Sequence, residues 1–287
     1  MTTEASIGII GGSGLYSMAD FRLKKKISLK TPFGKPSDSF LLGELEGKEA
    51  IFLARHGVGH RHTPSEVNFR ANIWGMKKLG VGAILSVSAV GSLKKEIEPG
   101  HMVVIDQFFD RTRGRPSTFF ERGIVAHVSF ANPVCESLRR QLIAASRASG
   151  VVMHERGTYV CMEGPMFSTK AESHFYRSCG ADVIGMTNLT EAKLAREAEI
   201  CYATLALSTD YDCWHESREP VTADEVIAVL NQNALTAQKI LKRTVGRLEK
   251  TEGCACRNAL RHAIVTDLKK IPPATKARLK LIIGRYL

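Results

Sequence analysis

The chain has 287 residues, of which 44% are hydrophobic and 24% are charged, a composition that excludes disorder over most of its length. No apolar run approaches the roughly 18 residues of a membrane span, and no basic segment or cleavage site precedes the first apolar run at Ile7, so we expect a cytoplasmic protein without a membrane partner. The net charge of +11 favours an anionic partner, but six basic residues fall in the acid-free tail at 269–287, so the excess alone does not indicate nucleic acid.

Expected strands alternate with expected helices along the chain, the pattern of a mostly parallel sheet. Residues 200–207 are almost all apolar, which indicates a strand covered on both faces. We therefore expect a single α/β domain with a central mixed, largely parallel β-sheet flanked by helices. That domain covers residues 1–253, and a C-terminal extension, residues 254–287, packs on it or on a neighbouring subunit. The expected strands span residues 7–10, 40–45, 50–54, 83–90, 102–106, 158–162, 182–186 and 200–207, with a hairpin turn at 46–48.

Three helices have terminal signals. The first covers residues 65–79 and stops at Gly80. The second begins at the Asn132-Pro133 pair, a helix cap followed by proline at the first helical position. The third covers residues 223 to about 250, and Thr222 with Glu225 forms a capping box at its start.

Two carboxylates, Asp210 and Asp212, follow the apolar run at 200–207. In open α/β sheets, ligands bind beyond the carboxyl ends of the strands, where these acids could accept hydrogen bonds from a ring N–H and an exocyclic amine. The alternative is that such an acid only caps a helix or closes a turn.

Polar residues at other strand ends suggest a divided phosphate site. Arg55 and His56 follow one strand, Ser88 lies near the end of another, and Thr187 follows a third. The loop Gly11-Gly12-Ser13-Gly14 can also direct N–H groups at an anion, although it lacks the spacing of a dinucleotide fingerprint. Each has a plainer interpretation, as a tight turn or a surface arginine beside a half-buried histidine.

A turn-rich loop at residues 163–168 carries Phe167, whose ring could stack on a planar base or simply pack within the loop.

Most of the seven cysteines lie in apolar context, as expected of reduced thiols in the cytosol. The exception is Cys254-Ala255-Cys256. A zinc site normally has longer spacing and a second ligand pair, and no second pair is evident in the sequence, so we expect no metal. Two interpretations of these cysteines remain open, free thiols and a redox-sensitive pair.

Together these segments resemble the 5′-methylthioadenosine phosphorylases of the trimeric purine nucleoside phosphorylase family, from about residue 7 to 242. The resemblance implies the purine/uridine phosphorylase-like fold. The matching strings are Gly11-Gly12-Ser13-Gly14, residues 31–38, Leu53-Ala54-Arg55-His56-Gly57, residues 68–74, Glu163-Gly164-Pro165 and residues 209–214.

The resemblance implies an enzyme, a pentosyltransferase (glycosyltransferase) of purine and methionine salvage. It would convert 5′-methylthioadenosine and phosphate reversibly into adenine and 5-methylthio-α-D-ribose 1-phosphate, with phosphate as co-substrate and no cofactor. Asp210 would act as general acid at N7 of the base and Asp212 would bind the 6-amino group, the pair forming the catalytic acids. By matching position the other roles are phosphate binding by Ser13, Arg55, His56, Ser88 and Thr187, ribose contact by Met186, and base contact by Phe167.

The resemblance further implies a homotrimer or a dimer of trimers. His60, Val226 and, from a neighbouring subunit, His127 match positions that shape the pocket for the 5′ substituent. Some family members carry a Cys-x-Cys pair in a comparable place, so Cys254 and Cys256 could form a structural or redox-active bridge. 

Two alternatives stay open. A phosphorylase of the same fold could prefer inosine, 5′-methylthioinosine or 5′-deoxyadenosine. A basic nucleic-acid-binding protein without catalysis is the alternative of another class, although no aromatic and basic residues interleave as such a module requires.

Overall fold

The structure is a computed structural model that describes residues 6–12, 15, 18, 20–215, 223–249 and 253–287. Ser13, expected in the phosphate site, and Thr222, expected to cap a helix, lie outside these residues.

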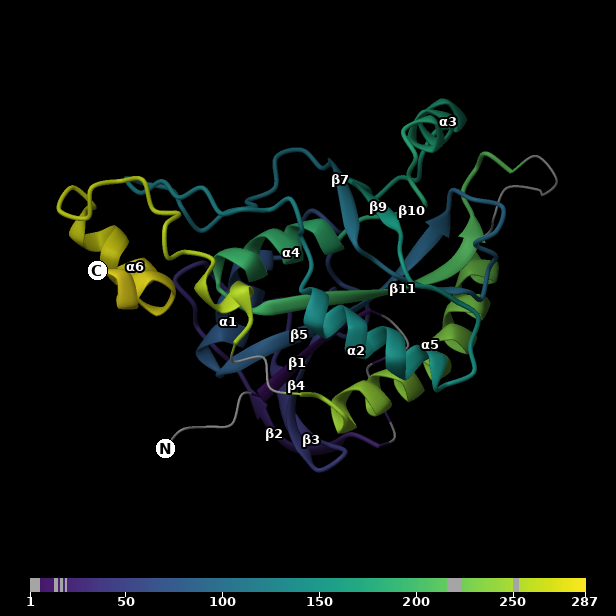
Figure 1. Cartoon of the computed structure of the whole chain (residues 1–287), viewed down its shortest axis with the longest axis horizontal. Coiled ribbons are helices and arrows are strands. Elements are labelled where there is room, and N and C mark those ends of the chain that lie inside the picture. Colours follow the sequence, from purple (N-terminus) through teal and green to yellow (C-terminus); the bar gives the residue numbers. More distant parts are fainter. Residues whose placement is uncertain (1–5, 13–14, 16–17, 19, 216–222, 250–252) are drawn as a thin grey trace.

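The described residues form one eleven-stranded mixed sheet (Figure 1). At its centre, β1 (Ser6–Gly11) pairs in parallel with both β4 (Lys48–Ala54) and β5 (Val81–Ser92), and β5 pairs in parallel with β11 (Cys201–Tyr211). The carboxyl ends of these four strands therefore share one edge of the sheet. The other strands are β2 (Arg22–Ile27), β3 (Phe40–Leu45), β6 (Met102–Val104), β7 (Gln107–Arg111), β8 (Met153–His154), β9 (Thr158–Met162) and β10 (Val183–Gly185).

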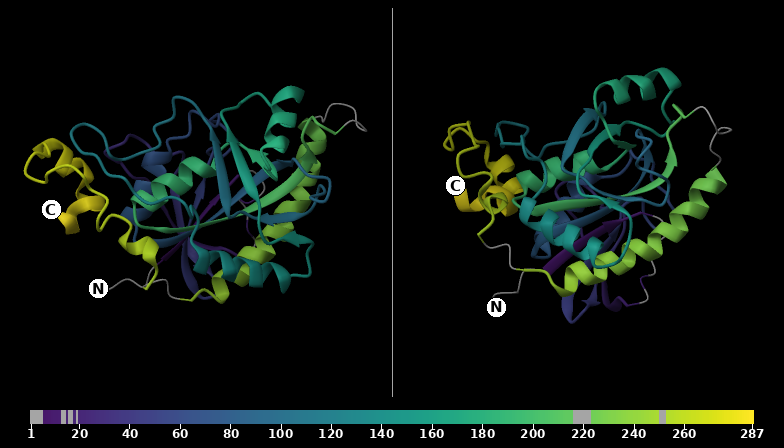
Figure 2. Two further views of the ribbon diagram at one scale, coloured as in Figure 1. Left: turned by 45° about the horizontal axis from the view of Figure 1, so that its top comes forward. Right: turned by 45° about the vertical axis from the view of Figure 1, so that its right-hand side comes forward.

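Helices cover both faces of the central strands, as the turned views of Figure 2 show. On one face α2 and α5 pack against each other and against β11. On the other face α1 and α4 pack against each other and against β5, and α4 also packs against β11. The helices are α1 (Phe69–Lys78), α2 (Glu136–Arg147), α3 (Lys170–Ser178), α4 (Asn188–Glu197), α5 (Ala223–Gly246) and α6 (Pro273–Ile283), with 3-10 turns η1 (Ala255–Asn258) and η2 (Gly284–Tyr286). No helix in the described ranges is long and apolar enough to cross a membrane.

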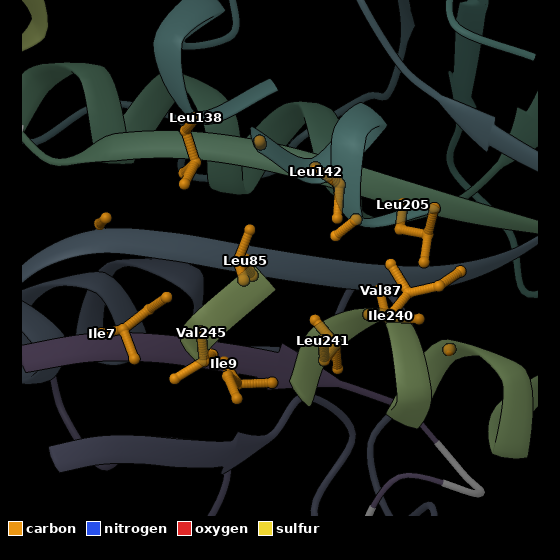
Figure 3. Packing of buried hydrophobic residues seen from close by; sticks show 14 of the residues in the cluster. Ile7, Ile9, Leu85, Val87, Leu138, Leu142, Leu205, Ile240, Leu241 and Val245 are labelled. Carbon is orange, nitrogen blue, oxygen red and sulfur yellow. The ribbon is translucent and has the colours of Figure 1, made fainter. Parts of the chain in front are cut away.

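Side chains of the central strands alternate between two hydrophobic layers because successive strand residues point to opposite faces. Leu85 and Val87 of β5 point toward α2 and α5, whereas Ile84 packs with α1 and α4. Figure 3 shows the first layer, in which side chains of β1, β5 and β11 meet Leu138, Leu142, Ile240, Leu241 and Val245. Burial on both faces accounts for the long apolar runs of these strands.

The C-terminal extension packs on the same chain. Its apolar residues join the buried cluster that contains Ile73 and Met76 of α1. A backbone bridge also ties Ala126 to Ile264. The residues that the extension contributes to this cluster are Leu260, Ala263, Ile271, Leu279, Ile282 and Ile283.

The expected mixed, mostly parallel sheet is confirmed, and so is the hairpin of β3 and β4. The helix expected from residue 65 begins later, at Phe69, because Asn68 accepts a hydrogen bond from Ala71 N and caps it. The helix start expected at Asn132-Pro133 is wrong: α2 begins at Glu136, after Cys135. Strand β11 also runs further than expected, through Asp210 to Tyr211.

Candidate active site

The ends of the central strands meet where ligands bind in open α/β sheets. The N–H of Arg55, just beyond β4, donates to Gly11 O at the end of β1 over 2.9 Å. This bond holds the start of the glycine loop against the Arg55-His56 corner, so two of the expected phosphate-binding segments lie together.

The two expected acids are adjacent to a glycine of the next strand. Asp210 pairs with Gly91 of β5 after a register shift in β11 between Ser208 and Asp210. A Cβ atom added to Gly91 would lie 3.3 Å from Asp210 Oδ2 and 3.5 Å from the Cβ of Asp212. The glycine therefore leaves room for the Asp210 carboxylate, and the Cβ atom of Asp212 lies beside it.

Burial disfavours the charged form of both acids. It raises the pKa of Asp210 to about 6, although a 2.6 Å hydrogen bond from Thr209 Oγ1 opposes the shift and the nearby charge of Asp212 adds to it. Burial also raises the pKa of Asp212. A carboxyl group with a pKa near neutrality is suited to give up a proton during a reaction.

Asp212 has an unused acceptor. Its side chain is buried, and no hydrogen bond of normal geometry reaches Oδ2 from any residue that the structure describes, although contacts with Ser173 and Ser168 oppose the rise in the pKa of Asp212. A buried acceptor without a well-formed hydrogen bond is costly, so an added donor would stabilise it. The exocyclic amine of a bound base would supply one.

Ser88 and Thr187 converge beside the Tyr159 hydroxyl. Strand β10 runs antiparallel to β5, which carries the chain from Gly185 back toward Ser88. Thr187 N donates to Tyr159 Oη over 3.4 Å, and the nearby Ser88 side chain, whose hydroxyl donates to Ala89 O, opposes the rise in the pKa of Tyr159. Thr187 stands at the N-cap of α4 but its side chain makes no capping bond. A free hydroxyl at a helix N-terminus favours binding of an anion.

Arg55 points inward rather than into open space. The whole residue is 1% exposed. Its guanidinium forms an ion pair with Glu191 through two hydrogen bonds, Nε to Oε1 over 2.5 Å and Nη2 to Oε2 over 3.1 Å. Nη1 donates to Val87 O and Nη2 to Ser86 Oγ. The guanidinium has five N–H groups, so these contacts leave one for an anion.

His56 is held as a neutral ring. Burial, together with the positive charge of Arg55, lowers its pKa to about 4. Nδ1 lies 2.8 Å from the carbonyl oxygen of His62, which can only accept, so Nδ1 carries the proton. His60 stacks on this ring with 4.3 Å between centroids. In the free protein, Nε2 of His56 is therefore an acceptor.

The chain matches the family profile described as "Phosphorylase superfamily" over residues 6–246. It belongs to this family. An S-methyl-5'-thioadenosine phosphorylase of Geobacter sulfurreducens is 57% identical over 99% of this chain and 100% of its own length. A methylthioadenosine phosphorylase from an Antarctic soil metagenomic library is 50% identical, with a TM-score of 0.91 over 98% of this chain and 99% of its own. A methylthioadenosine phosphorylase from Schistosoma mansoni, solved with adenine, is 34% identical, with a TM-score of 0.84 and 98% of both chains covered.

In this phosphorylase, Arg115 organises the loop at residues 163–168. Its side chain pairs with Glu163 Oε1 over 3.0 Å and donates to Met186 O over 2.5 Å. This ties the loop to the segment that leads into Thr187. Phe167 is 74% exposed, so the packed-loop interpretation is wrong in the single chain, and its ring remains available to stack on a ligand.

The remaining expected residues do not all gather in one chain. His60 lies by His56, but His127 is exposed on a segment whose backbone bonds to Ala263 of the C-terminal extension. That extension lies at the opposite end of the molecule from α3, near which β11 ends (Figure 1). Val226 belongs to α5, but its side chain is outside the described residues.

Glu191, Tyr159 and Arg115 were not among the site residues expected from the sequence. Glu191 lies in the first turn of α4, a helix that was not expected. A signal was present in Thr187 followed four residues later by a glutamate, the spacing of a helix start with an acid in its first turn. Nothing in the sequence indicates that the partner of this acid is Arg55, because 136 residues separate them.

Proposed function

We propose that this phosphorylase cleaves 5′-methylthioadenosine with inorganic phosphate, reversibly, to adenine and 5-methylthio-α-D-ribose 1-phosphate. The observation that carries the proposal is the pair of buried acids at the end of β11, one with a pKa of about 6 and the other with an unused acceptor. The relatives above carry names that state the same substrate.

The chemistry begins with a proton at the base. Protonated Asp210 donates to N7 as the C1′–N9 bond breaks, so adenine leaves as a neutral molecule and Asp210 becomes a carboxylate. Asp212 Oδ2 accepts from the 6-amino group, which favours an aminopurine over an oxopurine at this site. Phe167 flanks the base, and Met186 lies against the ribose.

Phosphate attacks from the other side of the sugar. Its negative charge stabilises the positive charge that develops on the ribose, and one of its oxygens then bonds to C1′. Ser13, Ser88 and Thr187 hydrogen-bond the anion, with the N-terminus of α4 directed at it. Arg55 contributes its charge and its remaining N–H. His56 Nε2 accepts the proton of a hydrogen phosphate.

The phosphorolysis requires no metal or organic cofactor, because the acid, the anion and the binding groups supply each step. We further propose a homotrimer or dimer of trimers that acts in the cytoplasm in purine and methionine salvage. In it His127 of a neighbouring subunit joins His60 and Val226 around the 5′ substituent. The proposal includes no nucleic-acid partner.

The first test is adenine release from 5′-methylthioadenosine, measured by chromatography with and without phosphate and repeated with 5′-methylthioinosine and inosine. We expect release that depends on phosphate, matched by equimolar 5-methylthioribose 1-phosphate, and a much lower kcat/KM for the 6-oxopurines. Release without phosphate would make the protein a hydrolase. Preference for the inosine forms would remove the assigned role of Asp212.

A Thr187→Val variant is expected to raise the KM for phosphate by roughly 10- to 100-fold, the effect of losing one hydrogen bond to a charged group. The hydroxyl does not cap α4, so the helix itself should keep its stability. Thr187→Ser, which retains the hydroxyl, is the matched control and should remain within a few-fold of the parent. An unchanged KM in the valine variant would exclude Thr187 from the phosphate site.

A further inference from the structure

Four cysteines from distant parts of the chain meet near the start of β11, at the opposite end of this strand from the acids. The sulfur atoms of Cys135, Cys201, Cys254 and Cys256 all lie within 4.8 Å of one another. Cys201 begins β11, nine residues before Asp210, so at about 3.3 Å per residue the cluster lies some 30 Å from the catalytic acids. The sequence showed no second ligand pair for Cys254 and Cys256, but the fold supplies one in Cys135 and Cys201.

The spacing of the four sulfurs fits a tetrahedral metal ion. With a zinc–sulfur bond of about 2.3 Å, the sulfurs of a tetrahedral site lie about 3.8 Å apart. The sulfurs of Cys135 and Cys254 are 3.5 Å apart, and all four cysteines are free thiols in the structure. Small movements of the side chains would complete the tetrahedron.

The cluster lies at a helix N-terminus and in a site closed to water. Cys135 stands at the N-terminus of the twelve-residue helix α2, where the helix dipole stabilises an anion. Cys135, Cys201 and Cys256 are buried in the hydrophobic layer between α2, α5 and the sheet, with Cys254 packed at its edge. This position excludes water from a fourth coordination site.

We propose that Cys135, Cys201, Cys254 and Cys256 bind one Zn²⁺ ion as a structural tetrathiolate site. Four thiolates are soft ligands in the geometry that zinc prefers, and each thiol that is still protonated releases its proton to solvent on binding. The ion would fasten η1, and through it the C-terminal extension, to the starts of α2 and β11. Because the protein supplies all four ligands, the ion takes no part in the phosphorolysis.

The test is the zinc content of the full chain, purified without oxygen and with a reductant from zinc-supplemented cells. After exhaustive dialysis we expect one zinc per chain by mass spectrometry of the elements. Cys256→Ser and Cys254→Ser should each retain less than a tenth of that zinc, whereas Cys179→Ser, at an exposed cysteine outside the cluster, should retain all of it. Zinc in the wild type at well below one per chain would overturn the proposal, and so would full zinc in the Cys256→Ser variant.

A second measurement on the unaltered chain covers the case in which the serine variants fail to fold. Co²⁺ added to the metal-free protein should produce the thiolate-to-cobalt charge-transfer absorption and the intense visible bands of a tetrahedral site, and Zn²⁺ should abolish both. Zinc removal should also lower the unfolding temperature, because a ligand bound to the folded state stabilises it. Absence of the cobalt spectrum, or two disulfides within the cluster in the protein as purified, would show that no metal site exists.

Discussion

An Asp210→Asn variant is expected to lose about 10²- to 10⁴-fold in kcat for phosphorolysis of 5′-methylthioadenosine, the range for removal of a general acid. Asparagine has nearly the same shape and can still accept the hydrogen bond from Thr209 Oγ1, so the strand end should keep its structure. It can also hydrogen-bond N7, but it has no proton to transfer. The loss should therefore appear in kcat more than in KM for the nucleoside.

The same substitution is expected to stabilise the ligand-free protein at high pH. The folded-state pKa of about 6 is above the ordinary value of 3.8, so the folded protein binds this proton more tightly than the unfolded chain does. The stability linked to Asp210 is complete below pH 3.8 and is lost as the pH rises through 6. The loss amounts to about 3 kcal/mol at most. Asp210→Asn should then unfold at a higher temperature than the parent at pH 8 and show no such gain at pH 4.

Asp267→Asn is the control for both measurements, because Asp267 is an exposed acid on the C-terminal extension. It should change neither kcat nor the pH dependence of unfolding. A kcat for Asp210→Asn within a few-fold of the parent would exclude Asp210 as the acid. Equal stability changes at pH 4 and pH 8 would instead contradict the burial that raises its pKa.

The central strands were predictable because their burial is visible in the sequence. Strands such as β5 and β11 are covered on both faces, so they appear as long apolar runs. Strand β2 was missed because five of its six residues are exposed at the edge of the sheet and three of them are lysines. Helix α4 was missed for the opposite reason, since its buried residues include asparagine, threonine and two glutamates whose partners are distant in sequence.

In the candidate site, too, local sequence patterns indicated some residues, whereas others depend on distant contacts. Strand ends indicated Asp210, Arg55 and Ser88, because parallel strands bring their carboxyl ends to one edge whatever the loops between them. No local pattern could show that Arg55 turns inward, because its partner Glu191 lies on a helix crossing from another part of the chain. The cysteine cluster likewise joins four positions from three separate segments. Such sites depend on tertiary packing rather than on local spacing.

Glu191→Ala is expected to destabilise the protein by about 3–5 kcal/mol, because it leaves the Arg55 guanidinium buried without a counter-charge. Glu191 Oε2 also accepts hydrogen bonds from Ser86 Oγ over 2.8 Å and Tyr202 Oη over 2.9 Å. Both hydroxyl groups would lose this acceptor in the variant. The loss should appear as a lower denaturant midpoint. Glu98→Ala, at an exposed acid, is the matched control and should change the midpoint little.

A double variant separates the lost charge from lost packing. Arg55→Met with Glu191→Leu removes both charges and fills similar volume, so it should recover much of the stability that Glu191→Ala loses. Phosphorolysis should remain impaired in the double variant, because the positive charge behind the phosphate site is gone. If the double variant were as unstable as the sum of Arg55→Met and Glu191→Leu alone, the pair would not be coupled. Full activity in a folded double variant would show that phosphate binding does not need Arg55, and would leave Ser88, Thr187 and the N-terminus of α4 as the groups that hold the anion.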